Sequence, residues 1–523
     1  MSARPATLSV WAAVAAAAAA LPSPALTPQE RAGKRVYLEG ESPSGRELRA
    51  TIAGGTSVRA SAVPCASCHG ADGLGRPEGG LFPPELTWPE LMKPYGHAHA
   101  NARSHPAFDE STLARAIAEG IDPGGNALDP AMPRYAISRD DLASLMAYLK
   151  VLEREEDTGV SASRIRLGTV LPREGPVAEI GVAIHEALQA AFEEINARGG
   201  INGRKLELAV LPSGEAGPQR LEEARRLLAR ESPFALVSGF APGAEQELAS
   251  LAEETRVPLV GPFAPFAMRA DENARYAFHL VGGMREQSLA LAEWAARELQ
   301  SAQGRIAILH AANRGAEDVA RAVLQRLRSR GCPRARRVEY GPGEVDASLV
   351  ARLRARETKA ILFLGDDGEL AAFTAAAERL RWAPWILAPG ALSARAAAAA
   401  PLLFDGKVFL AYPARPPVER SRTRDSLPAV EARVGAREGH AGARAFARAA
   451  AAVFAEALRQ TGRHLTRERL VESLENLHDF DAGLGPRLGY GPGRRVGAHG
   501  AYVVAVDLAR RTVRPVSGWI SID

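Results

Sequence analysis

Short apolar runs alternate with amphipathic helices from residue 164 onward, and this alternation constrains the fold more than any other feature of the chain. The runs fall at 165–172, 206–210, 234–239, 257–263, 277–282, 305–311, 360–365, 385–389 and 407–413. Short apolar strands separated by helices are typical of parallel sheets covered on both faces. About 360 residues is too many for one such sheet. The pattern over 164–523 therefore predicts two α/β lobes that divide near residues 265–285.

The end of this region predicts two more helices and a hairpin. Helical spacing of apolar residues covers 436–460 and 466–475. Residues 501–520 alternate between apolar and polar side chains around Arg510 and Arg511, which predicts a terminal hairpin.

The chain before residue 153 has a different composition. Residues 28–152 are rich in glycine and proline and show no clear strand alternation. Helical spacing is found over 31–37, over 111–119 and after Ser138, which is a favourable N-cap residue. We expect a small all-α domain wrapped around something large, followed by a linker at 153–163.

The first 25 residues have the layout of a secretory signal peptide. Arg4 precedes an apolar run over 8–21, and small residues follow at 23–25. A run of this length is shorter than the roughly 20 residues that span a bilayer, so we expect an exported, periplasmic protein. An uncleaved N-terminal anchor is the alternative. The net charge of +4, from 65 basic and 61 acidic residues, gives no concentrated basic face for nucleic acid.

Two of the three cysteines lie in the string Cys65-Ala66-Ser67-Cys68-His69. Thiols at this spacing can both reach the vinyl groups on one edge of a porphyrin, with the histidine beneath the iron. A zinc site needs four ligands, usually in two pairs. A thioredoxin-like pair would follow a strand of a βαβ unit, and a disulfide would leave the histidine unexplained. The motif predicts one covalently bound haem c.

The second axial ligand must come from the same domain, and the residue that fits is Met132. It lies between Pro130 and Pro133, which fix the local backbone ahead of the last helix. A methionine opposite the histidine is typical of electron carriers. The weaker alternatives are Met92, Met146, or a bis-histidine arrangement using His97, His99 or His105, three residues expected to lie in a solvated loop.

Residues 28–152 resemble a class I cytochrome c domain. The resemblance rests on the strings at 64–75, 132–135 and 138–150, which occur in the order of that family. It implies single-electron transfer between a dehydrogenase or quinol oxidase and a terminal acceptor. Iron with six ligands has no open position for a substrate, so we expect an electron carrier and binding protein rather than an enzyme.

Residues 164–520 resemble the type I periplasmic solute-binding proteins of the branched-chain amino acid group, most specifically at 196–204. This resemblance implies two lobes that close on a small ligand near the hinge. The hydroxyl residues that would hold an amino acid carboxylate are absent from 239–243 and 261–265, so we expect an apolar or aromatic ligand. The candidate cleft residues are Phe240, Ala241, Phe263, Ala264, Arg314, Asp366 and Asp367. Cys332, which follows Gly331, is expected to be an unpaired, partly buried thiol.

The two units together predict a periplasmic electron carrier whose binding domain docks or senses a small molecule. Its expected redox partner is a periplasmic dehydrogenase or a terminal oxidase chain. The alternatives are a solute receptor that serves an ABC permease, with the haem as an accessory, and a docking scaffold without a ligand.

Overall fold

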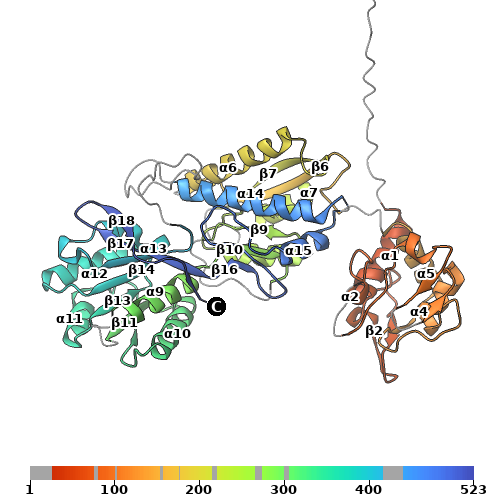
Figure 1. Ribbon diagram of the computed structural model, residues 1–523, viewed down its shortest axis with the longest axis horizontal. Helices are drawn as coiled ribbons and strands as arrows, with labels where there is room; N and C mark the ends of the chain where they lie inside the picture. Colours follow the sequence, from red (N-terminus) through yellow and green to blue (C-terminus); the bar gives the residue numbers. More distant parts are fainter. Residues whose placement is uncertain are drawn as a thin grey trace, which may run out of the picture.

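The computed structural model describes a small helical domain followed by two α/β lobes (Figure 1). The predicted signal peptide, residues 1–25, lies outside the described residues. The described residues are 26–75, 80–99, 103–152, 157–175, 177–214, 221–264, 274–299, 305–415, 440–463 and 465–522.

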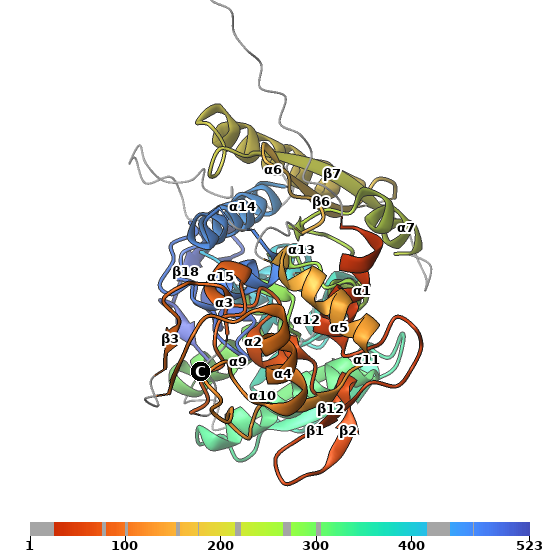
Figure 2. The same ribbon diagram turned by 90° about the vertical axis from the view of Figure 1, so that its right-hand side faces the viewer.

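The small domain is built on two helices that cross at a glycine. Helices α1 (Pro28–Glu39) and α5 (Arg139–Leu149) lie against each other in Figure 2. A Cβ on Gly33 would lie 1.9 Å from the Ser144 carbonyl oxygen, so only glycine permits this approach. Ser138 caps α5 as the sequence predicts. The other helices of this domain are α2 (Cys65–His69), α3 (Trp88–Leu91) and α4 (Glu110–Glu119).

The small domain also contains short strands, which were not predicted from the sequence. Strand β1 (Arg49–Thr51) pairs with β2 (Ser57–Arg59) on one side and β5 (Arg134–Ala136) on the other. Strands β3 (His97–Ala98) and β4 (Ser104–His105) form a separate antiparallel hairpin. Strands of two or three residues are too short to show a period of two in the sequence.

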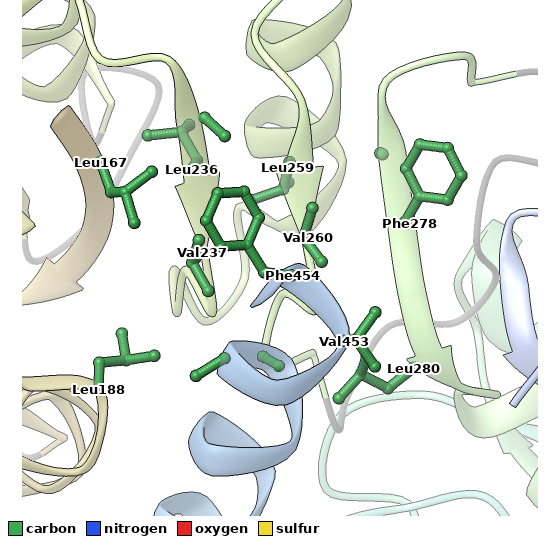
Figure 3. Close-up of a cluster of buried hydrophobic side chains, with 14 of the residues drawn as sticks. Leu167, Leu188, Leu236, Val237, Leu259, Val260, Phe278, Leu280, Val453 and Phe454 are labelled. Atoms are coloured by element: carbon green, nitrogen blue, oxygen red, sulfur yellow. The ribbon is translucent and has the colours of Figure 1, made fainter. Parts of the chain in front are cut away.

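The first lobe holds a parallel sheet of six strands within the described part of the chain, in the order β16-β10-β9-β8-β6-β7. Val453 and Phe454, from a helix near the C-terminus, pack against Val237 and Val260 of its central strands (Figure 3). The strands are β6 (Arg164–Pro172), β7 (Lys205–Ser213), β8 (Ala235–Val237), β9 (Leu259–Val260), β10 (Ala277–Val281) and β16 (Val496–Ala498). The helices are α6 (Ala178–Ala197), α7 (Glu222–Glu231), α8 (Glu245–Thr255), α14 (Ala441–Thr461) and α15 (Arg467–Glu475).

The second lobe holds the sheet β12-β11-β13-β14-β15-β17-β18, with β19 beside β17. Its strands run parallel up to β15 and antiparallel beyond it. The predicted terminal hairpin is confirmed as the pair of β17 and β18. The strands are β11 (Ile306–Ala311), β12 (Arg336–Tyr340), β13 (Ala360–Phe363), β14 (Trp385–Pro389), β15 (Val408–Tyr412), β17 (Gly500–Asp507), β18 (Thr512–Pro515) and β19 (Ile520–Ser521). The helices are α9 (Met284–Glu298), α10 (Arg314–Ser329), α11 (Ala347–Ala355), α12 (Asp367–Arg379) and α13 (Gly390–Ala398).

The chain passes between the lobes three times. It leaves the first lobe after β10, returns between β15 and α14, and leaves again between β16 and β17. The first crossing lies within the predicted stretch at 265–285. The two later crossings add α14, α15 and β16 to the first lobe, which no local pattern in the sequence indicates.

Candidate functional site

The Cys65–His69 segment is the short helix α2, and tyrosine hydroxyls hold the backbone at both of its ends. Tyr37 Oη donates to the Gly70 carbonyl oxygen over 2.7 Å, and Tyr135 Oη donates to the Val63 carbonyl oxygen over 2.5 Å. These two bonds link α2 to α1 and to β5, which lie far from it in the sequence. The position of α2 is therefore set by the surrounding domain.

His69 is buried and held in one tautomer. Its side chain is only 8% exposed, and Nδ1 lies 2.9 Å from the Pro84 carbonyl oxygen. A carbonyl can only accept, so Nδ1 carries the hydrogen and the Nε2 lone pair remains available to a metal. Burial lowers the pKa of His69, although the bond to Pro84 opposes this shift. The ring is thus the neutral imidazole that haem iron requires.

The two thiols of α2 are unbridged. Cys65 is half-buried and Cys68 is exposed. Burial raises the pKa of Cys65 to about 12, so this thiol stays protonated at neutral pH. Two free thiols beside a neutral, oriented imidazole fit a covalently attached haem. When bound, the haem supplies reversible one-electron chemistry.

The Met132 loop is tied to the segment that carries the thiols. Met132 is half-buried, and its backbone N–H donates to the Asp129 carbonyl oxygen over 3.0 Å. Tyr135, three residues later, makes the hydrogen bond to Val63 described above. Met146, one of the alternatives, packs in the core of the small domain, while Met92 packs at its edge.

The three alternative histidine ligands form a cluster on the hairpin of β3 and β4. The prediction of a solvated loop is wrong for His105, which is 6% exposed, because its ring packs between His97 and Phe108. Partial burial and the nearby Arg103 lower the pKa of His99 to about 4.

The predicted cleft residues of the first lobe form an aromatic cluster. Phe240 and Phe263 make an edge-to-face contact at 5.3 Å between ring centroids, and Phe263 makes another with Phe446 of α14 at 5.2 Å. Phe240 and Ala241 are buried, while Phe263 and Ala264 are half-buried. Aromatic rings therefore occupy the end of the sheet where the sequence analysis expected ligand-binding loops.

The predicted cleft residues of the second lobe lie at the starts of helices. Arg314 is exposed at the first position of α10. Asp366 caps α12 by accepting from the Glu369 backbone N–H over 2.9 Å. Asp367 accepts from the Ala396 backbone N–H over 2.7 Å and thereby joins α12 to α13. The structure thus gives both carboxylates hydrogen-bond partners within the second lobe.

The sequence analysis overlooked Ser238, at the carboxyl end of β8. Its side chain is fully buried, and its hydroxyl has no hydrogen-bond partner among the described residues. Ser238 lies inside the predicted strand at 234–239, whereas the hydroxyl residues were expected in the loops at 239–243 and 261–265.

The family model for periplasmic binding proteins matches residues 164–511, about two thirds of the chain. The chain belongs to the periplasmic binding protein family. A second family model, for cytochrome c, matches residues 59–153, which contain α2 and Met132. The protein therefore joins a cytochrome c domain, which implies a covalently bound haem, to a periplasmic binding protein domain. Both families are usually exported and typically non-enzymatic.

Known relatives of the binding-protein domain include "Leu/Ile/Val-binding protein homolog 7" of Brucella abortus, 32% identical over 112 residues. That match covers 21% of this chain and 27% of the relative, so the chain spans about a quarter of the length of this protein. A leucine-binding protein from Thermotoga maritima has a TM-score of 0.54 at 19% identity, over 69% of this chain and 99% of its own. A fatty acid ABC transporter substrate-binding protein from Thermomonospora curvata has a TM-score of 0.53 at 17% identity, over 71% of this chain and 95% of its own.

The cytochrome domain meets the first lobe of the binding-protein domain at α15. Asp72, three residues after His69, accepts from Arg469 Nε over 2.9 Å, and both side chains are mostly buried. A cavity of about 230 Å³ lies at this junction, lined by Tyr148 and Leu152 on one side and Arg256 and Arg467 on the other. Within the described ranges, none of the helices is long and apolar enough to span a bilayer.

Proposed function

We propose that this protein is a periplasmic electron carrier that passes single electrons through one haem held by Cys65, Cys68, His69 and Met132. The observation that supports this most directly is the buried His69, whose Nδ1 faces the Pro84 carbonyl oxygen beside two free thiols. Cys65 and Cys68 would attach the haem and His69 Nε2 would ligate its iron, while Tyr37 and Tyr135 keep α2 in place.

The segments that hold α2 in place would also set where a redox partner meets the haem. The Gly75 N–H donates to the His69 carbonyl oxygen over 2.8 Å, and Gly75 packs against the Pro83 carbonyl. We propose that a periplasmic dehydrogenase or a terminal oxidase chain docks on the cytochrome domain beside α2.

The binding-protein domain, in this proposal, docks or senses a small apolar or aromatic molecule. The aromatic cluster of Phe240, Phe263 and Phe446 supports such a ligand over a simple amino acid. The second candidate function is a solute receptor for an ABC permease. It is favoured by the relatives, which are named as Leu/Ile/Val-binding proteins and ABC transporter substrate-binding proteins.

A redox titration of the purified full-length protein tests the electron-transfer proposal. We expect one covalent haem per chain and a reversible one-electron step, followed by reduction in the presence of a periplasmic dehydrogenase and its substrate. A chain that lacks covalent haem, or whose haem cannot be reduced reversibly, would contradict the proposal.

Thermal unfolding with added ligands separates the two roles of the binding domain. Leucine, a medium-chain fatty acid and an aromatic acid are added separately, because a specific ligand raises the unfolding temperature by mass action. Stabilisation by leucine would contradict the expectation of an apolar or aromatic ligand. No stabilisation by any of the three compounds would contradict the sensing role and favour a docking scaffold.

A further inference from the structure

Three histidines lie on one face of the hairpin formed by β3 and β4. His97 and His105 are cross-strand partners, and His99 follows His97 by two residues, the spacing that returns a side chain to the same face of an extended segment. The centroid of the His105 ring lies 4.8 Å from the centroid of the His97 ring and 5.1 Å from that of the His99 ring. The proposed haem ligation uses none of these imidazoles.

Two of the rings direct nitrogen atoms at each other. His99 Nε2 and His105 Nε2 are 3.0 Å apart. His105 Nδ1 lies 2.7 Å from the Pro106 carbonyl oxygen and must donate to it. The neutral His105 ring therefore presents its Nε2 lone pair to His99, and the carbonyl fixes the ring as second-shell groups do in metal sites.

Side-chain and backbone contacts anchor the hairpin. Asn126 Nδ2 donates to the Ser104 carbonyl oxygen over 3.1 Å, and Arg103 pairs with the fully buried Asp122 over 2.8 Å. The Asp122 carboxylate balances the charge of Arg103, which lies near His99, and Glu90 balances that of Lys93, which lies near His97. The site is thus preformed, while His99 remains half-exposed and accessible to an ion.

The two nitrogens share a proton in a hydrogen bond of 3.0 Å, and a bound ion would replace that proton. At this separation both nitrogens could lie about 2.1 Å from one ion with an angle of about 90° at the ion. Among divalent first-row ions Cu²⁺ has the highest affinity for imidazole nitrogen, and its tetragonal geometry accepts a right angle between neighbouring ligands.

We infer that His99 and His105 form a binding site for a divalent copper ion on the surface of the cytochrome domain. No group of three or more His, Cys, Asp or Glu side chains in the described residues is arranged to hold a metal ion. In this inference the ion has His99 and His105 as protein ligands and takes its remaining ligands from solvent. His97, whose Nε2 faces the Leu91 carbonyl oxygen at 3.4 Å, supports His105 by stacking.

Copper titration of the oxidised, full-length haem protein tests this site. We expect one Cu²⁺ per chain, with electron paramagnetic resonance showing coupling to two imidazole nitrogens. His99→Gln and His105→Gln should each weaken binding at least about tenfold, because each removes one of two protein ligands. His97→Gln should change the affinity by less than about threefold, because that ring only stacks.

His185→Gln provides the matched control, since His185 is a half-buried histidine on α6 of the binding-protein domain. His99→Gln is the decisive variant, because its half-exposed side chain can be changed without opening the core. Equal copper affinity in the wild type and His99→Gln would overturn the inference. The contact between His99 and His105 would then be only a hydrogen bond. Loss of binding in His185→Gln would overturn the inference as well.

Discussion

The protonation of His69 depends on a carbonyl fifteen residues further along the chain. Pro84 accepts the Nδ1 hydrogen, and burial lowers the pKa of the ring, so Nε2 can present its lone pair to iron. The opposite side of the iron is assigned here to Met132, and this assignment can be tested directly.

Replacing Met132 with alanine should remove the sixth ligand of the iron. Water or hydroxide would take its place, so we expect a lower midpoint potential and a changed visible spectrum, because thioether ligation raises the potential. Met92→Leu is the control, since Met92 packs at the edge of the small domain. If both properties change in Met92→Leu and neither changes in Met132→Ala, the ligand is Met92.

His279 on β10 should make the stability of the binding-protein domain depend on pH. Burial lowers the pKa of its imidazole to about 4, against about 6.5 in the unfolded chain. Between these values the unfolded state binds more protons, so stability falls as the pH drops from 6.5 toward 4, by about 3 kcal/mol at most. Urea unfolding of wild type and His279→Gln at several pH values measures this. Parallel curves for the two proteins would exclude His279 as the cause.

At the scale of helices and strands, the close crossing of α1 and α5 depends on Gly33, which has no side chain. Gly33→Ala would place a methyl group against the Ser144 carbonyl, and we expect a loss of about 2 kcal/mol in the cytochrome domain from overpacking. Thermal unfolding followed through the haem absorbance measures the effect. Arg35→Ala, on the exposed side of the same helix, should leave the unfolding temperature unchanged.

The sequence predicted the elements whose signal lies within one short stretch of residues, such as a continuous apolar run or a helical spacing of apolar side chains. The apolar strands of both lobes and the helix after Ser138 were found this way, and the Cys65–His69 motif was found because its chemistry is complete within five residues. Strand β12 was missed because its side chains are largely polar and partly exposed at the sheet edge. The bonds of His69 to Pro84 and of Tyr135 to Val63 join residues that only the folded domain brings together.

At the scale of the whole molecule, the Asp72–Arg469 pair should hold the two domains in one arrangement. Arg469→Ala would leave a mostly buried carboxylate without this partner, so we expect looser docking. Small-angle X-ray scattering should show a larger radius of gyration, and the predicted linker at 153–163 should be cleaved faster by proteases.

The reversed pair, Asp72→Arg with Arg469→Asp, should restore the compact arrangement. Arg444→Ala is the control, since Arg444 pairs with Glu186 on the surface of the first lobe alone. An unchanged radius of gyration in Arg469→Ala would show that other contacts hold the domains together.

The placement of this junction has a mechanical consequence. The cytochrome domain is bonded to α15 of the first lobe, while the second lobe is joined to the first by three separate chain crossings. Any rotation of the second lobe about those crossings carries no part of α2 with it. If the Asp72–Arg469 junction holds, α2 moves with the first lobe, and a partner docked on the cytochrome domain would keep its orientation while the second lobe turns.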